Sequence, residues 1–167
     1  MLKEINYTDY ANKAVAILSK GAFLNTSANG KNNTMTIAWG SIGFMWGTPT
    51  FTIMVRKSRY THEILAKNPE FTVSIPLKEM KEALKICGTK SGRNCDKFAE
   101  ANLTANPGQK VNAPIIEGAG LHFECKVVYQ QDMKKENLEP AVADRWYKDN
   151  DYHTLYYGEI IAAYIEQ

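Results

Sequence analysis

Cysteine is scarce in this sequence of 167 residues, which contains only Cys87, Cys95 and Cys125 and no pair spaced as Cys-x-x-Cys. An odd number of cysteines without such spacing is not typical of a disulfide framework. Three thiols are also one short of a zinc or iron–sulfur site built from cysteine alone. We therefore expect reduced thiols and no metal site. A redox role for Cys95, which lies in a polar and basic stretch, is the alternative.

Long apolar runs and a large excess of charge are also absent. No apolar run in the sequence approaches the roughly 18 residues that indicate a membrane-spanning helix, and the segment Met1–Tyr7 has no apolar signal-peptide core. The net charge of +2 gives no general reason to expect nucleic acid or a membrane as a partner. We therefore expect a cytoplasmic protein, folded as one domain over residues 1–167.

Short segments of alternating polarity predict strands. The expected strands are Ala22–Ser27, Asn33–Trp39, Thr50–Arg56, Glu70–Ile75, Leu121–Gln131 and His153–Ile165. The expected helices are Tyr10–Lys20, Thr61–Lys67, Glu79–Cys87, Asn94–Ala101 and Ala141–Tyr147. Asn29-Gly30 predicts a hairpin turn, and Gly40–Pro49 predicts a loop that exposes Phe44 and Trp46. Because strands and helices do not alternate regularly, we expect a mainly β fold with some α: an antiparallel barrel with short peripheral helices.

Two polar segments carry the most specific signal. In Asn33–Trp39, hydroxyl and amide groups alternate with apolar residues, as in a half-buried strand. The segment Arg56–Thr61 collects basic and hydroxyl residues just before a predicted helix, whose first N–H groups and positive partial charge suit a phosphate. A strand whose polar groups can contact the edge of a planar ring, followed by a segment that can bind phosphate, indicates a nucleotide-like cofactor. The alternatives are a plain edge strand and a solvated basic turn.

Alternation along these segments gives specific expectations for side chains. Thr34 and Thr36 share one strand face, so we expect them to address the ring while Met35 enters the core. Arg56 is expected to bind the phosphate, because its planar fork donates two parallel hydrogen bonds. We expect Thr61 to be the N-cap of the following helix.

A third segment, Gly88–Arg93, resembles a phosphate-binding P-loop only superficially. Its glycines are separated by three residues instead of four, and no lysine followed by serine or threonine comes next. The segment still offers backbone N–H groups, the Ser91 hydroxyl and the nearby Lys97 cation to an anion, with a plain turn as the alternative. Gly118-Ala119-Gly120 lacks the third glycine and the context of a dinucleotide-binding fingerprint.

Four blocks in this order resemble the flavin reductase family, and most of all its flavoredoxin-like branch. The blocks are Asn33–Trp39, Pro49–Phe71, Cys87–Phe98 and His153–Ile160. The resemblance implies an FMN-binding split barrel, a homodimer, and FMN contacts from these residues: Asn33, Thr34, Met35, Thr36, Arg56, Ser58 and Thr61, with support from Ser91 and Lys97. The sequence departs from the family at Ala38, where many relatives have serine, and at Lys134–Asp151, which has no clear counterpart.

The resemblance implies an FMN-binding oxidoreductase that passes electrons between NAD(P)H or another donor and a flavin, a small acceptor or a redox protein. His153 lies in a matching block, where it is expected to place a nicotinamide or donate a hydrogen bond near the flavin; an ordinary strand histidine is the alternative. Two other functions stay open. One is a non-enzymatic FMN electron carrier, and the other is a split-barrel binding protein that has lost flavin.

Overall fold

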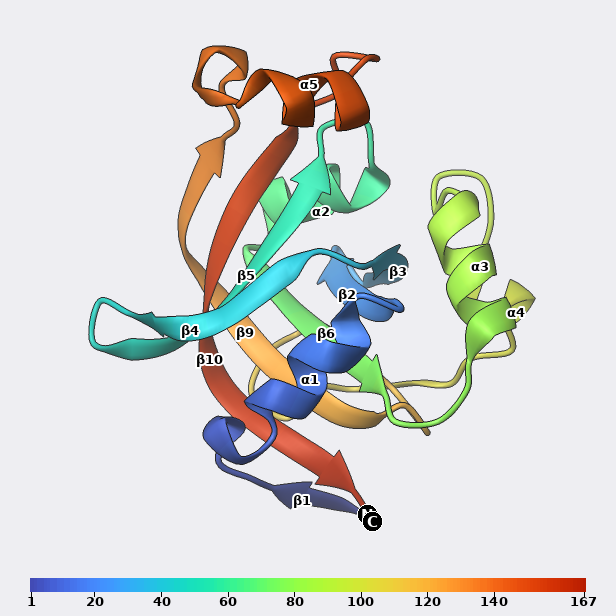
Figure 1. Ribbon diagram of the computed structural model, residues 1–167. Helices are drawn as coiled ribbons and strands as arrows, with labels where there is room; N and C mark the ends of the chain where they lie inside the picture. Colours follow the sequence, from blue (N-terminus) through green and yellow to red (C-terminus); the bar gives the residue numbers. More distant parts are fainter.

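The computed structural model describes residues 1–167, and strands make up most of its regular structure (Figure 1). The strands are β1 Leu2–Glu4, β2 Ala22–Ala28, β3 Lys31–Ile37, β4 Gly40–Met45, β5 Thr48–Arg56, β6 Glu70–Pro76, β7 Ala105–Asn106, β8 Ile115–Ile116, β9 Gly120–Asp132 and β10 His153–Glu166. The helices are η1 Tyr7–Asp9, α1 Ala11–Leu18, α2 Tyr60–Lys67, α3 Lys81–Thr89, α4 Lys97–Glu100, η2 Lys135–Asn137 and α5 Pro140–Trp146. None of these helices has the length and apolar character needed to cross a membrane.

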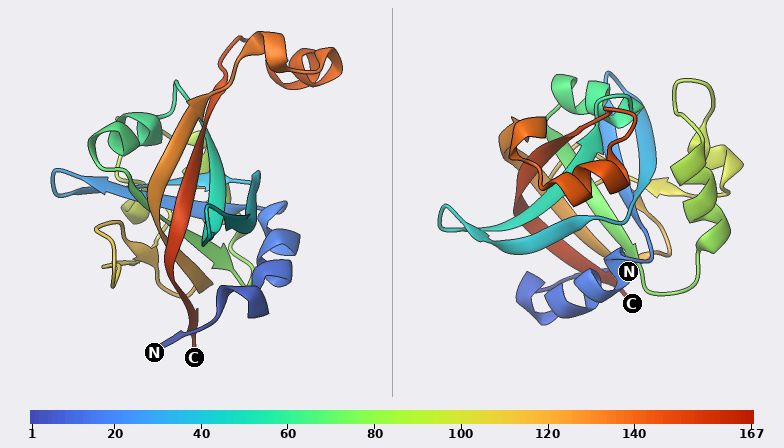
Figure 2. Two further views of the ribbon diagram at one scale, coloured as in Figure 1. Left: turned by 90° about the vertical axis from the view of Figure 1, so that its left-hand side faces the viewer. Right: turned by 45° about the horizontal axis from the view of Figure 1, so that its top comes forward.

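The main sheet is antiparallel throughout and has the strand order β3-β2-β6-β9-β10-β5-β4, with β1 paired to β10. β3 and β4 are the two ends of this order, yet β3 ends at Ile37 and β4 begins at Gly40. A connection this short reaches only about 10 Å, so the sheet must curl until its edges approach one another. The result is the predicted antiparallel split barrel with peripheral helices, which Figure 2 shows from two further directions.

The interior of the barrel is filled by buried side chains from both halves of the sheet. Phe51, Phe71 and Phe123 are completely buried there, and Leu18 of α1 packs against the same cluster. Burying each such side chain contributes about 1.5–3 kcal/mol. Gly158 lies at a bulge of β10, where a Cβ atom would come within 2.5 Å of the Phe71 ring. The bulge therefore needs glycine for close packing rather than for an unusual backbone angle.

The segment Gly40–Pro49 differs from its predicted loop, because it forms most of a hairpin between β4 and β5. Trp46 and Gly47 occupy the turn with φ angles of 52° and 77°. Tryptophan is rare at positive φ, so no ordinary turn signal marks this position in the sequence. The predicted exposure of Phe44 and Trp46 is confirmed, since both side chains are more than 60% exposed (66% and 63%).

A buried carboxylate, that of Glu124 on β9, holds a long irregular segment against the barrel. Glu124 is fully buried and accepts hydrogen bonds from the backbone N–H groups of Gln109, Lys110 and Val111, at 2.8, 2.7 and 3.0 Å. Hydrogen bonds to a charged group are shorter and stronger than neutral ones. Glu124 therefore holds the Gln109–Val111 part of the connection between α4 and β9 against the sheet.

We expect Glu124→Gln to lower the free energy of unfolding by about 1.5–3 kcal/mol, because an amide removes the charge and turns N–H groups toward N–H groups. Urea unfolding followed by circular dichroism measures this change. Glu136→Gln, at an exposed position of η2, is the matched control and should leave the midpoint unchanged. Equal midpoints for Glu124→Gln and the wild type would contradict the assigned role.

Candidate functional site

Three segments far apart in the sequence meet at the side chain of Asn33 on β3. Its Nδ2 atom donates a hydrogen bond of 3.0 Å to the Thr61 hydroxyl at the start of α2. Gly92, in the loop after α3, lies against the same amide, and a Cβ atom there would overlap Asn33 Oδ1. The Lys31 ammonium adds a hydrogen bond of 3.1 Å to the Gly92 carbonyl oxygen. Asn33 is only 4% exposed, so this junction is a built part of the fold.

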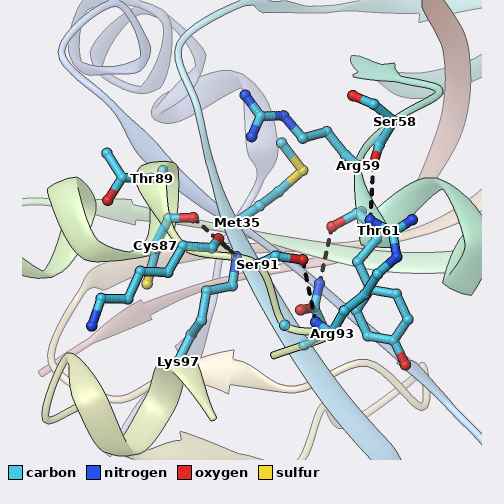
Figure 3. Close-up of a pocket in the computed structure, with 14 residues that line it drawn as sticks. Met35, Ser58, Arg59, Thr61, Cys87, Thr89, Ser91, Arg93 and Lys97 are labelled. Atoms are coloured by element: carbon cyan, nitrogen blue, oxygen red, sulfur yellow. Dashed lines mark hydrogen bonds between the residues drawn. The ribbon is translucent and has the colours of Figure 1, made fainter. Parts of the chain in front are cut away.

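The junction borders a polar cavity of about 120 Å³, shown in Figure 3. Its lining comes from β3, from the start of α2, and from α3 with the segment that follows it: Asn33, Met35, Ser58–Thr61, Cys87–Arg93 and Lys97. Tyr60 and Thr61 are the first two residues of α2, and the N–H groups of a first helical turn have no intrahelical acceptor. Positive partial charge at a helix start favours an anion. The polar cavity therefore combines N–H groups, hydroxyls and cations.

Lys97 brings a buried cation to this cavity. It is 5% exposed, and its Nζ atom donates to the carbonyl oxygens of Cys87 and Lys90, at 3.0 and 3.2 Å. These carbonyls belong to the last turn of α3 and its C-cap. Burial lowers the pKa of Lys97 below its usual value. The ammonium thus both closes the end of α3 and places charge beside the polar cavity.

Two arginines at the polar cavity differ in their partners. Arg93 pairs with Glu63 through Nε and Nη2, and its Nη1 donates to the Ser58 carbonyl oxygen at 2.9 Å. Arg93 therefore ties the loop after α3 to the start of α2. The Arg59 guanidinium has no hydrogen-bond or ion-pair partner. Figure 3 shows the Arg59 side chain extending beside Met35, on the opposite side of the view from Lys97. Arg59 is thus the cation that is free to bind a ligand.

A second hollow, here called the tryptophan cleft, adjoins the polar cavity. It has a volume of about 170 Å³ and is lined by residues of β3, β5 and β10 and their connections: Met35–Trp39, Met54, Arg56, Arg59 and His153. Met35 and Arg59 line both hollows. Typical ligand pockets have about 300–1,000 Å³, which neither hollow reaches alone. A cofactor-sized ligand would have to occupy both, with Met35 and Arg59 at its middle.

His153 is held rigidly in the tryptophan cleft. Its Nδ1 atom shares a hydrogen bond of 2.7 Å with the Tyr147 hydroxyl, and its ring lies 5.5 Å from that of Trp39. Burial, with a contribution from the Arg56 charge, lowers the pKa of His153 to about 4. The imidazole is therefore neutral near pH 7 and can serve as a hydrogen-bonding group without adding charge.

The predicted site residues fall into three groups. Six of them line the polar cavity: Asn33, Met35, Ser58, Thr61, Ser91 and Lys97. Three line the tryptophan cleft: Thr36, Arg56 and His153. Thr34 lines neither of these hollows, is fully buried, and borders a third groove that shares Asn33, Gly92 and Lys97 with the polar cavity. Nine of the ten predicted residues are thus brought to one region, although several face a different part of it than expected.

The site takes side chains from both faces of β3, whereas one face was predicted, because Thr36 and Met35 both line the tryptophan cleft. The Thr36 hydroxyl donates a hydrogen bond of 2.6 Å to the Leu84 carbonyl oxygen, because α3 packs over this side of the strand. Met35, which was expected in the core, lines both hollows. Thr34 and Thr36 alternate with Met35 along the strand as predicted, but α3 provides the hydrogen-bond acceptor of the Thr36 hydroxyl.

Arg56 also has a different neighbourhood from the predicted one. Its Nη1 atom donates to both carboxylate oxygens of Asp149, each at 3.0 Å, and to the Asp151 carbonyl oxygen at 2.9 Å. Its Nη2 atom donates to the Trp146 carbonyl oxygen at 2.7 Å. The Ser58 hydroxyl donates to the Asp151 carboxylate. The segment after α5 therefore occupies the donors that the sequence suggested for a phosphate.

Sequence reasoning missed the roles of Arg59, Gly92 and Arg93. Arg59, and not Thr61, is the N-cap residue of α2, whose first turn begins one residue earlier than predicted. Each of the three lay inside a segment that had been singled out, but no local pattern distinguishes a free arginine from a paired one. The structure distinguishes these roles in two ways. A Cβ atom at Gly92 would overlap Asn33, and Arg56 and Arg93 have protein partners whereas Arg59 has none.

The three thiols are free, and none is poised to react as a thiolate. Burial raises the pKa of Cys87 to about 11 and keeps the pKa of Cys125 well above its usual value. The pKa of Cys95 is also raised, mainly by desolvation. Because the thiolate is the reactive form, these directions argue against the redox role that was left open for Cys95.

Comparisons with known proteins place this geometry in context. A family model described as the flavin reductase like domain matches residues 15–167. A flavoredoxin from Methanosarcina acetivorans is 30% identical, over 88% of this chain and 68% of that protein, with a TM-score of 0.69. A flavoredoxin from Desulfovibrio vulgaris (Miyazaki F) is 27% identical, over 88% and 69%, with a TM-score of 0.70. At 17% identity, an FMN-binding domain of a flavin reductases-like enzyme from Shewanella baltica shares the fold over 99% of this chain and 77% of its own, with a TM-score of 0.71.

The depressed pKa of His153 makes stability depend on pH. The folded pKa of about 4 lies below the unfolded value of about 6.5, so the stability associated with neutral His153 is complete above pH 6.5 and falls as the pH drops toward 4. His153→Asn keeps a hydrogen-bonding atom for Tyr147 but does not titrate. We therefore expect the melting temperature of this variant to fall less than that of the wild type between pH 6.5 and pH 4. Differential scanning calorimetry measures both profiles, and parallel profiles would contradict the assignment.

Proposed function

The chain belongs to the flavin reductase-like domain family, and from this premise we propose that it is an FMN-binding oxidoreductase with residues 1–167 as one flavin reductase-like domain. The observation that carries the proposal is the shared boundary of the two hollows at Met35 and Arg59. One hollow offers donors for an anion, and the other offers apolar and aromatic walls. FMN has one phosphate and one planar ring, so its two parts match the chemistry of the two hollows.

The polar cavity is the proposed phosphate site. The N–H groups of Tyr60 and Thr61 and the free Arg59 guanidinium come from the start of α2, and the Ser91 hydroxyl and Lys97 come from the opposite wall. Backbone N–H groups at a helix start and a planar guanidinium both suit phosphate oxygens. Asn33 does not need to touch the ligand, because its hydrogen bond to Thr61 already holds β3 against the start of α2.

The tryptophan cleft is the proposed ring site. Met35, Ile37, Met54 and Trp39 offer apolar surface, and His153 offers one uncharged hydrogen-bonding group. FMN, when bound, supplies the electron-transfer chemistry, and the residues of the chain supply binding, orientation and exclusion of water. A serine, histidine or carboxylate acting as a strong acid or base is therefore not required. NAD(P)H is the proposed co-substrate.

A specific observation also favours a second candidate, a non-enzymatic FMN electron carrier. The two flavoredoxins are more similar to this chain in sequence, at 30% and 27%, than the Shewanella baltica protein is at 17%. In this function a protein or small-molecule redox partner would replace NAD(P)H as the donor. The two candidates share the fold and the cofactor, so only the response to a nicotinamide distinguishes them.

We expect Arg59→Ala to weaken FMN binding by about 1.5–3 kcal/mol, the scale of a hydrogen bond to a charged group, because it removes the one guanidinium at the site without a protein partner. Titration of the apoprotein with FMN, followed by flavin fluorescence, measures the affinity. Arg145→Ala, on the exposed side of α5, is the matched control and should bind like the wild type.

The same samples test the function. The wild type should turn yellow with FMN, retain the colour on gel filtration, and bleach on addition of NADH or NADPH without oxygen. Retention without bleaching would favour the electron carrier. A folded wild type that retains no flavin and oxidises no NAD(P)H with added FMN would overturn the proposal, and an unchanged affinity in Arg59→Ala would exclude this residue as the phosphate ligand.

We further propose that the protein is a homodimer that buries the hairpin of β4 and β5, which projects from the barrel in Figure 1. Trp46 packs on Tyr129 and Tyr157, with ring centroids 5.9 and 5.8 Å apart, and Phe44 and Val128 are also exposed. Monomeric proteins rarely leave such contiguous apolar surface uncovered.

Phe44→Ser combined with Trp46→Ser should therefore shift the protein from dimer to monomer, because it removes the apolar surface without touching the barrel core. Size-exclusion chromatography with light scattering measures the mass. Val15→Ser, at a position 47% exposed on α1, is the control and should leave the mass unchanged. A wild type that is monomeric at micromolar concentration would contradict the proposal.

A further inference from the structure

Residues 133–152 form an arm that lies across one end of the barrel. Figure 1 shows α5 over the ends of β5 and β10, and the left view in Figure 2 shows the arm extending past the sheet. Every residue from Lys134 to Trp146 except Leu138 and Ala143 is exposed. The arm therefore packs on little of the barrel along its first half, and its position depends on contacts made near its end.

Those contacts converge on one arginine. Arg56 makes four hydrogen bonds to the end of the arm, to the carbonyl oxygens of Trp146 and Asp151 and to both carboxylate oxygens of Asp149. Its guanidinium also lies 5.2 Å from the centre of the Tyr147 ring. The Arg56 side chain is only 18% exposed, so the bonds are partly shielded from water and are stronger than those of an exposed ion pair.

The latched arm also closes one side of the tryptophan cleft. The indole rings of Trp146 and Trp39 meet edge to face with centroids 4.8 Å apart, and the Tyr147 hydroxyl bonds His153. Trp39, Arg56 and His153 all line the cleft. Two indole rings in direct contact leave no passage between them, so a molecule can approach the cleft only around the arm.

We propose that Arg56 is a latch and that the arm of residues 133–152 determines which electron donors and acceptors reach the tryptophan cleft. With the arm latched, small planar molecules enter and bulky ones are excluded. The proposal rests on the proposed function, because it concerns the second substrate of the same site. It assigns Arg56 a role in substrate selection in place of phosphate binding.

The test uses two variants of the arm that lie outside both hollows, Asp149→Asn and Trp146→Ala, with Asp144→Asn as the control. Asp149 bonds Arg56 and the backbone of Asp151, whereas Asp144 is exposed on α5 and makes no hydrogen bond or ion pair. Each full-length protein is loaded with FMN and reduced, and its reoxidation is timed with ferricyanide as the small acceptor and cytochrome c as the bulky one.

We expect the ratio of the cytochrome c rate to the ferricyanide rate to rise about threefold in Asp149→Asn, the factor that follows from losing one partly exposed ion pair. The ratio should also rise in Trp146→Ala, because this variant removes the ring that contacts Trp39. The FMN dissociation constant should stay at its wild-type value. Asp144→Asn should match the wild type in both measurements. Unchanged rate ratios, or a loss of FMN affinity as large as that of Arg59→Ala, would overturn the proposal.

A readout without flavin separates this proposal from the proposed function. In the apoprotein, trypsin should cut after Arg145, a site not adjacent to the substitution, faster in Asp149→Asn than in the wild type, because the arm opens more often. Mass spectrometry identifies the cleaved bonds. Equal cleavage rates would overturn the latch even if FMN binds, whereas failure of FMN to bind would leave faster cleavage as evidence for the latch.

Discussion

The hydrogen bond between the Asn33 amide and the Thr61 hydroxyl is the contact on which the candidate site depends. It joins an edge strand to a helix start, and Gly92 brings a third segment against the same amide. None of the three segments forms a hollow alone. Because the amide is buried, losing its partner would leave an unsatisfied polar group at a cost of about 1–3 kcal/mol. The geometry of the polar cavity is therefore maintained by the stability of the fold.

Local patterns predicted much of the fold and the region of the site, because they report what adjacent residues do. Alternation located β2, β3, β5, β6, β9 and β10 but not β1, β4, β7 and β8, and Asn29-Gly30 located the turn between β2 and β3. Residue propensity did not predict the β4–β5 hairpin, because Trp46 adopts a positive φ in its turn. It also predicted too long a helix around α4, where the side chain of Asp96 caps a helix of only four residues. In both cases one residue determined an element boundary against the pattern around it.

Which arginine is free could not be predicted from the sequence. Arg56 and Arg59 lie in one short basic segment, and the planar fork of each suits a phosphate. The partners that distinguish them, Asp149 and Asp151, are more than ninety residues away in a segment without a recognised counterpart. The face of β3 posed the same difficulty, since the Thr36 hydroxyl is directed by the Leu84 carbonyl of α3. Side-chain roles here depend on long-range pairing, which no local period encodes.

The distribution of charge explains why the site suits one phosphate group. Of the arginines at the two hollows, Arg93 is paired with Glu63 and Arg56 with the end of the arm, and Lys97 is shared with two carbonyl oxygens. Arg59, at the boundary between the hollows, has neither an ion-pair partner nor a hydrogen-bond partner for its guanidinium. The remaining donors are N–H groups and hydroxyls, which carry partial charges. The cluster looks strongly basic in the sequence, but Arg56 and Arg93 are used to hold segments of the chain together, and Arg59 remains as the donor for a ligand. Such a site can bind one anion without attracting polyanions in general.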